Sequence, residues 1–135
     1  MTRTTLLIAL LVLYGAVLGR SQVERVLAPR PLDPFAARPK AVEELVVAGK
    51  FAHALPLAIE LETAYPDEPL VSYWLATINH GLGRAQDEAA AWDHYVRVSK
   101  APGDACPAWP DAYARAGHRA QAQAAADRCA EFDRQ

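Results

Sequence analysis

The residues best suited to acid–base or metal chemistry are four histidines, and they are dispersed along the chain. None belongs to an HExxH motif or to another pattern that brings a nucleophile, a base or metal ligands together. Adjacent acidic residues also occur, but they fit helix starts and solvated surface better than an acid–base pair. We therefore predict no catalytic residue, no metal and no cofactor, and a protein that is not an enzyme. The residues considered are His53, His80, His94 and His118, and the pairs Glu43-Glu44, Asp67-Glu68 and Asp87-Glu88.

Two further kinds of ligand site are also disfavoured. Trp74, Trp92 and Trp109 suggest an aromatic ligand box, but their spacing is that of packing residues, so we favour a core role. There is no glycine-rich phosphate loop and no evident site for a small-molecule substrate. The net charge is -2 with both signs interspersed, which supplies no clustered positive field for a nucleic acid.

The composition favours helices. Apolar residues make up 52% of the 135 residues, largely as alanine, and aromatic residues only 8%. Small side chains of this kind suit closely packed helices more than a β-sandwich, so the predicted class is all-α. Most basic residues are arginine, a usage typical of a GC-rich bacterial genome. The length leaves room for one compact domain behind an N-terminal segment.

That N-terminal segment, residues 1–28, is predicted to meet a membrane. An uncharged run from Thr4 to Gly19 follows Arg3, and it is long enough for a signal peptide or, with the residues after it, for a single-span helix. We favour the uncleaved anchor, and cleavage after Gly19 is the alternative. In an anchor, Gly15, Ala16 and Gly19 would place small residues where a partner helix packs.

Residues 29–39 are rich in proline and are expected to form a semi-rigid, extended spacer. Four arginines after the apolar run favour a cytoplasmic domain by the positive-inside rule. The charged start of the segment and the two cysteines favour the opposite side. We expect a single-pass inner-membrane protein with its domain on the periplasmic side, or a secreted or periplasmic protein after cleavage.

The main signal in the rest of the chain, residues 40–135, is a repeat. Gly49, Gly83 and Gly117 recur at two equal intervals, and each lies between two helix-like apolar stretches. A glycine with a left-handed backbone lets one helix end and an antiparallel one begin, so each unit should be a helical hairpin. The units span about residues 35–68, 69–102 and 103–135. The columns in register are Ala41, Leu75 and Trp109; Leu45, Asn79 and Tyr113; Ala58, Trp92 and Ala126; and Leu61, Tyr95 and Cys129.

This pattern resembles the tetratricopeptide repeat (TPR) family, whose hairpins of about 34 residues stack into an α-solenoid. Two prolines depart from the pattern: Pro56 and Pro110 fall inside expected helices, which should start late or bend. The residues that carry the resemblance are Gly49, Phe51, Ala54, Ala58 and Pro66 in the first unit, Leu75, Ala76, Gly83 and Trp92 in the second, and Tyr113, Gly117, Ala122 and Ala126 in the third.

Cys106 and Cys129 lie at nearly equal separations before and after Gly117 along the chain, so an antiparallel hairpin places them opposite each other. Inward-facing side chains on two packed helices come close enough for a disulfide. Two free buried thiols are the alternative, which a cytoplasmic location would favour. No paired-cysteine spacing indicates zinc.

The resemblance implies a concave surface that holds a protein or peptide segment. We therefore expect a binding scaffold, an accessory or assembly subunit of a membrane protein complex. The alternatives are a soluble secreted peptide-binding module and a regulatory component of an exported enzyme system. By position in the repeat, the groove residues would be Glu43 and Val47 in the first unit, Tyr73, Thr77 and His80 in the second, and Asp111 and Arg115 in the third.

Overall fold

The computed structural model describes the backbone of residues 34–135 and the side chains of residues 38–135. The predicted anchor, with Gly15, Ala16 and Gly19, lies outside these residues. Within them there are six α-helices, one 3-10 turn and no strand, which confirms the all-α prediction. No helix of this part of the chain is long and apolar enough to span a membrane. The elements are α2 (Pro34–Val47), α3 (Phe51–Ala64), α4 (Pro69–Gly81), α5 (Ala85–Val98), η1 (Pro102–Ala105), α6 (Trp109–Arg115) and α7 (Arg119–Phe132).

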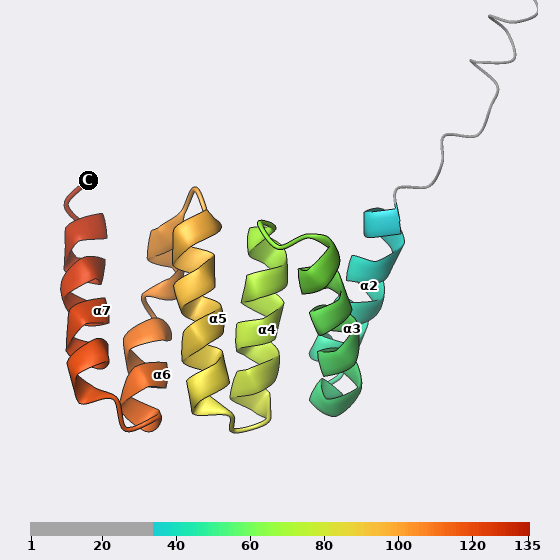
Figure 1. Cartoon of the computed structure of the whole chain (residues 1–135), viewed down its shortest axis with the longest axis horizontal. Coiled ribbons are helices and arrows are strands. Elements are labelled where there is room, and N and C mark those ends of the chain that lie inside the picture. The colour runs from blue at the N-terminus through green and yellow to red at the C-terminus, as the bar shows by residue number, and fades with distance from the viewer. Residues whose placement is uncertain (1–33) are drawn as a thin grey trace, which may run out of the picture. The chain divides into compact units, whose positions relative to one another are not determined.

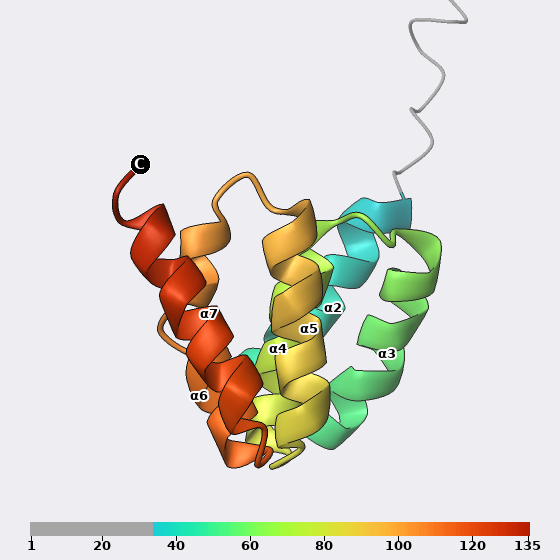
Figure 2. The same ribbon diagram turned by 60° about the vertical axis from the view of Figure 1, so that its left-hand side comes forward.

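Each helix of residues 34–135 packs against the next one along the chain. Figure 1 shows the helices side by side, running from α2 at one end to α7 at the other. The turned view in Figure 2 shows α6 and α7 together at one end and α2 and α3 together at the other. Helix α4 contacts α2, α3 and α5, so it lies at the centre of the first four helices.

The three glycines build the same turn three times. Gly49, Gly83 and Gly117 have φ values of 69°, 70° and 82°, and they follow α2, α4 and α6. After each glycine, a backbone N–H donates to the carbonyl five residues earlier: Lys50 to Leu45, Arg84 to Asn79 and His118 to Tyr113, at 2.8–2.9 Å. This bond closes a helix end around a left-handed residue. The predicted hairpin turns are therefore confirmed.

The prolines give a mixed outcome. Helix α2 begins at Pro34, so the prediction of an extended spacer to residue 39 is wrong for residues 34–39. Proline is tolerated at a helix start, and Pro39 removes one hydrogen bond that the burial of Val42 offsets. Helix α3 contains Pro56 yet starts directly at Phe51, so it does not start late. Helix α6 does start late, with Pro110 in its first turn.

Two apolar clusters form the core of the described residues. The first joins α2, α3 and α4 around Val42, Leu61 and Ile78, all of which have no exposed surface. The second joins α5, α6 and α7 with η1 around Trp92 and Trp109. The three tryptophans are 5%, 6% and 8% exposed, which confirms their core role.

The predicted disulfide is present. Cys106 and Cys129 are bonded, with their Cα atoms 5.7 Å apart. Cys106 directly follows η1 and Cys129 lies in the last turns of α7, so the bond connects the two ends of the third unit. No free cysteine is present in the described residues.

Candidate functional site

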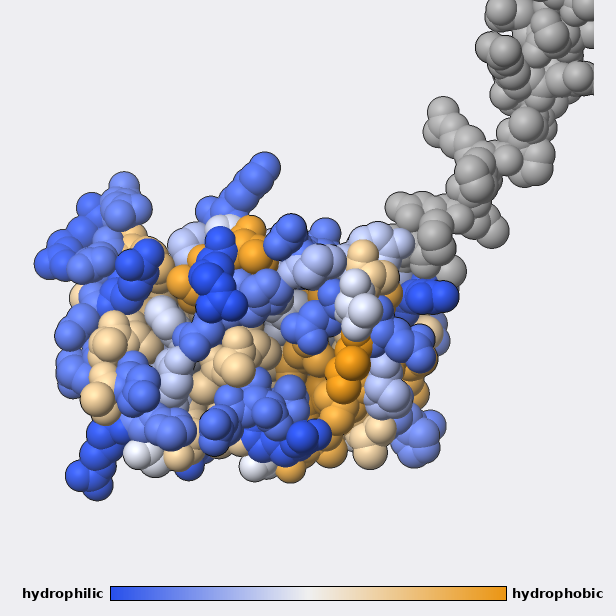
Figure 3. Space-filling model, in the orientation of Figure 1, coloured by the Kyte–Doolittle hydropathy of each residue, from blue (hydrophilic) through white to orange (hydrophobic). Residues whose placement is uncertain are grey.

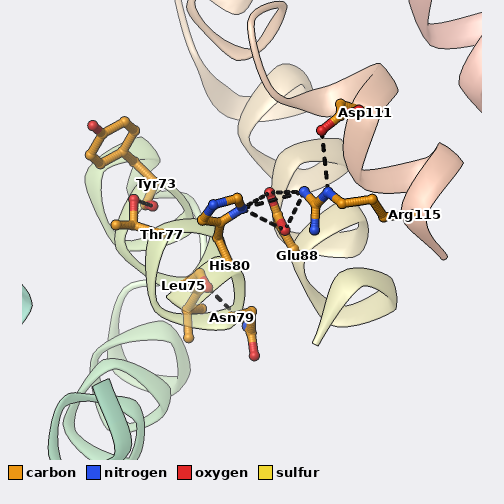
Figure 4. Close-up of polar contacts among 8 residues, drawn as sticks. All are labelled: Tyr73, Leu75, Thr77, Asn79, His80, Glu88, Asp111 and Arg115. Atoms are coloured by element: carbon orange, nitrogen blue, oxygen red, sulfur yellow. Dashed lines mark hydrogen bonds and ion pairs between the residues drawn. The ribbon is translucent and has the colours of Figure 1, made fainter. Parts of the chain in front are cut away.

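A buried carboxylate lies at the centre of the most elaborate polar cluster in the described residues. Glu88 belongs to the first turn of α5, and only 1% of it is exposed. Nη2 of Arg115 donates to both carboxylate oxygens, at 2.9 and 2.8 Å. Nδ1 of His80 lies 3.2 and 3.3 Å from the same two oxygens. Figure 4 shows these side chains converging from α4, α5 and α6.

Arg115 extends this cluster to a fourth residue. Its Nε donates to Asp111 at 3.2 Å, one helical turn earlier in α6. The hydrogen bond to Glu88 raises the pKa of Arg115 above its ordinary value, so the guanidinium stays charged. The other terminal nitrogen, Nη1, makes no hydrogen bond within residues 38–135 (Figure 4). The cluster therefore holds the Arg115 guanidinium through Nε and Nη2 and leaves the N–H groups of Nη1 available to a ligand.

His80 fits this cluster in either tautomer. Nδ1 also lies 3.3 Å from Nη2 of Arg115. With a proton on Nδ1, the ring donates to Glu88; without it, the ring accepts from Arg115. The side chain is 64% exposed, so its other nitrogen is accessible to a ligand.

An apolar hollow lies along the same helix. Tyr73, Thr77 and His80 occupy one face of α4, since they are spaced by four and three residues. Tyr73 is 44% exposed and packs edge-on against Trp92. With Leu70, which is 42% exposed, it borders a hollow of about 400 Å³. From Leu70 to His80 the helix rises about 15 Å, so this face carries an apolar and a charged end. The hollow is lined by Glu68, Pro69, Leu70, Tyr73 and Tyr95.

The structure thus joins some of the predicted groove residues and leaves others apart. His80, Asp111 and Arg115 meet in one network, although 35 residues separate His80 from Arg115. Tyr73 and Thr77 lie beside each other on α4, where the Thr77 hydroxyl donates to the Tyr73 carbonyl at 2.9 Å. Glu43 and Val47 are exposed on α2, and neither has a side-chain interaction with this network.

The pair Asp87-Glu88 was interpreted as a helix start or solvated surface, and burial of Glu88 was not predicted, although a signal existed. Ala54 and Ala122 occupy the corresponding positions of the units before and after it, so the other two units have alanine in this column. A carboxylate in a column of small packing residues is costly to bury unless it is paired. Such a substitution points to a polar cluster, and its partners are found only in the fold.

A second acid, the half-buried Asp93, was also missed. It accepts hydrogen bonds from Nε1 of Trp109, at 2.7 Å, and from the hydroxyl of Tyr113. The arrangement joins α5 to α6 within the second core cluster. Both carboxylate oxygens accept a hydrogen bond inside the fold, so Asp93 holds α6 against α5.

This arrangement predicts an alkaline transition. Burial, followed by the hydrogen bond to Asp93, raises the pKa of Tyr113 from 10.0 to about 12. The neutral phenol is thus favoured by folding; this stabilisation is complete below pH 10 and is lost as the pH rises toward 12. The difference in phenolate absorbance at 295 nm between wild type and Tyr113→Phe should show the shifted titration. Asp93→Asn should move it toward 10.0, and a titration centred at 10.0 in wild type would contradict the expectation.

Nothing in the described residues indicates a metal centre: no three His, Cys, Asp or Glu side chains are placed to bind one ion. Comparisons of the chain with protein-family models, with curated proteins and with solved structures gave no match. The cluster around Glu88 and the adjoining face of α4 are the features of the described residues that best fit a binding site.

Proposed function

We propose that the chain is a TPR-like α-solenoid scaffold that binds a segment of a protein partner along α4 and α6. The observation that carries this proposal is the Glu88 cluster, which holds an accessible imidazole and guanidinium over a buried carboxylate. Burying a charge costs free energy, and the other two units avoid this cost because they have Ala54 and Ala122 at the corresponding position. We infer that Glu88 is retained because it positions His80 and Arg115. Three identical glycine turns at equal spacing support the repeat assignment.

The chemistry of this surface indicates what it binds. Nη1 of Arg115 suits an acidic group, and an apolar side chain fits the hollow beside Leu70 and Tyr73. The two features lie about 15 Å apart along α4, a distance that an extended segment of about five residues spans. The partner is therefore expected to present an apolar residue and an acidic residue at this separation.

The Cys106–Cys129 disulfide supports a location on an oxidising side of the membrane, because such bonds persist mainly in exported domains. With residues 1–28 as an anchor, the chain would act as an accessory or assembly subunit of a membrane complex. Anchoring confines both partners to one surface, which raises their effective concentration and compensates for a short groove.

Site-specific photo-crosslinking in cells tests the proposal. A photoreactive residue in place of Thr77, which faces the groove, should give one discrete protein adduct, whereas the same residue in place of Gln121 on α7 should not. The matched variant Tyr73→Ala should reduce the Thr77 adduct at least about fivefold, since it truncates one wall of the hollow. Equal adducts from positions 77 and 121, or none from either in the presence of all native partners, would overturn the proposal.

A further inference from the structure

A second hollow lies away from the Glu88 cluster, between α3 and α5 with α4 beneath it. Its volume is about 280 Å³, and Leu55, Ile59 and Leu75 provide an apolar lining. Figure 3 shows hydrophobic surface over α3 and beside it, bordered by hydrophilic side chains. The complete lining is Leu55, Ile59, Glu62, Leu75, Asn79, Arg84, Asp87, Ala90 and Ala91.

The hollow contains a polar group that the fold does not use. Asn79 is only 5% exposed, and its Nδ2 donates to the Leu75 carbonyl at 2.9 Å. Its Oδ1 is buried and has no hydrogen-bond partner in the described residues. Figure 4 shows the carboxamide directed away from His80 and Glu88, with Oδ1 at its end. A buried acceptor without a donor costs about 1–3 kcal/mol, so its retention points to a donor from outside.

The other two units form the same turn without a carboxamide at this position. Leu45 and Tyr113 occupy the same position in the first and third units. All three end their helices with the same backbone bond after the glycine. The asparagine therefore replaces a larger or apolar side chain only in the unit that carries the hollow.

The charges around the hollow favour a cation. Glu62 is half-buried and forms no hydrogen bond or ion pair in the described residues. Asp87 forms an ion pair with Arg84 at 2.9 Å, so the charge of Arg84 is already neutralised. One carboxylate thus remains unpaired, in the same lining as the unpaired acceptor of Asn79.

We propose that this hollow binds an arginine side chain presented by a partner polypeptide. The guanidinium has several N–H donors in one plane, so it can bond Asn79 Oδ1 and Glu62 together, whereas its methylene stem packs on Leu55 and Ile59. A lysine ammonium is more strongly hydrated and lacks the planar fork. The site is separate from the groove of α4 and α6, and it gives the scaffold a second point of attachment with the opposite charge preference.

The test is a titration of the ¹⁵N-labelled full-length chain, followed by NMR. Nα-acetyl-arginine amide should shift the Asn79 side-chain resonances and the Ala90 and Ala91 amides saturably, with millimolar affinity. Nα-acetyl-norleucine amide, which keeps the stem and lacks the donors, should bind at least about tenfold more weakly. Equal binding of the two compounds, or no saturable shift with the arginine compound, would overturn the proposal.

Two variants make the assignment specific. Asn79→Leu removes the acceptor and should lower the arginine affinity at least about tenfold, while its melting temperature stays unchanged or rises because an unpaired buried group is lost. Glu62→Gln removes the charge without touching the core and should weaken the same compound at least about fivefold. Unchanged affinity in both folded variants would contradict the site.

The groove of α4 and α6 is independent of the arginine site. Tyr73→Ala should therefore leave arginine binding unaltered, and failure of one site does not imply failure of the other.

Discussion

Replacing Arg115 with alanine should lower the free energy of unfolding by about 2 kcal/mol at neutral pH. The change leaves the Glu88 carboxylate, 1% exposed, with His80 as its remaining partner. Removing one member of a buried ion pair costs about 3–5 kcal/mol. The smaller figure expected here reflects the Arg115 side chain, which is 35% exposed and whose pairing is therefore partly screened by solvent. Urea unfolding followed by circular dichroism measures the effect.

The double variant Glu88→Ala/Arg115→Ala separates the buried charge from the loss of side-chain packing. Ala54 and Ala122 occupy the position of Glu88 in the other two units, so alanine is compatible with this helix interface. We expect the double variant to be more stable than Arg115→Ala alone. Asp111→Ala, which removes only an exposed pair of α6, should cost less than about 0.5 kcal/mol. Strictly additive single effects would show that Glu88 and Arg115 do not interact.

Reducing the Cys106–Cys129 disulfide should lower the free energy of unfolding by about 3 kcal/mol. The bond closes a loop with a sequence separation of 23, and the chain-entropy model gives this magnitude for a loop of that size. The third unit has few other stabilising contacts, because α6 has only seven residues and Ala125 is the only buried residue of α7. For a domain of about 100 residues, the change corresponds to a fall in melting temperature of more than about 10 °C.

Thermal unfolding with and without a reductant measures this effect. The variant Cys106→Ser/Cys129→Ser is the matched control, because its melting temperature should be low and independent of the reductant. Hydrogen exchange of the reduced protein should increase first in α7, where the covalent link to η1 is lost. The same melting temperature for the oxidised and fully reduced wild type would contradict the expectation.

The features that the sequence predicted correctly are those set by local backbone geometry or by regular spacing. Gly49, Gly83 and Gly117 adopt the left-handed conformation that their positions indicated. Cys106 and Cys129 are bonded because a hairpin turning at Gly117 brings nearly equidistant residues together. Pro110 delays α6 as expected, since a missing N–H and a fixed φ act within one turn.

The start of α2 was predicted less well. The four prolines from residue 29 to residue 39 favour extended chain, yet the helix begins at Pro34. The preference of a proline-rich segment for an extended backbone is overcome here, because Val42 becomes fully buried against α3 and α4. Burial of an apolar face then outweighs the hydrogen bond that Pro39 removes.

By itself, the sequence determined the helical class, the regular spacing of the glycines, the three turns and the cysteine pair. These depend on single residue types or on spacing along the chain. The tertiary structure alone decided that Glu88 binds Arg115, 27 residues away, and that Asn79 keeps an unpaired acceptor. The free energy that a buried polar group contributes depends on which donors and acceptors the packed helices bring within about 3 Å of it. No local sequence pattern encodes those distances.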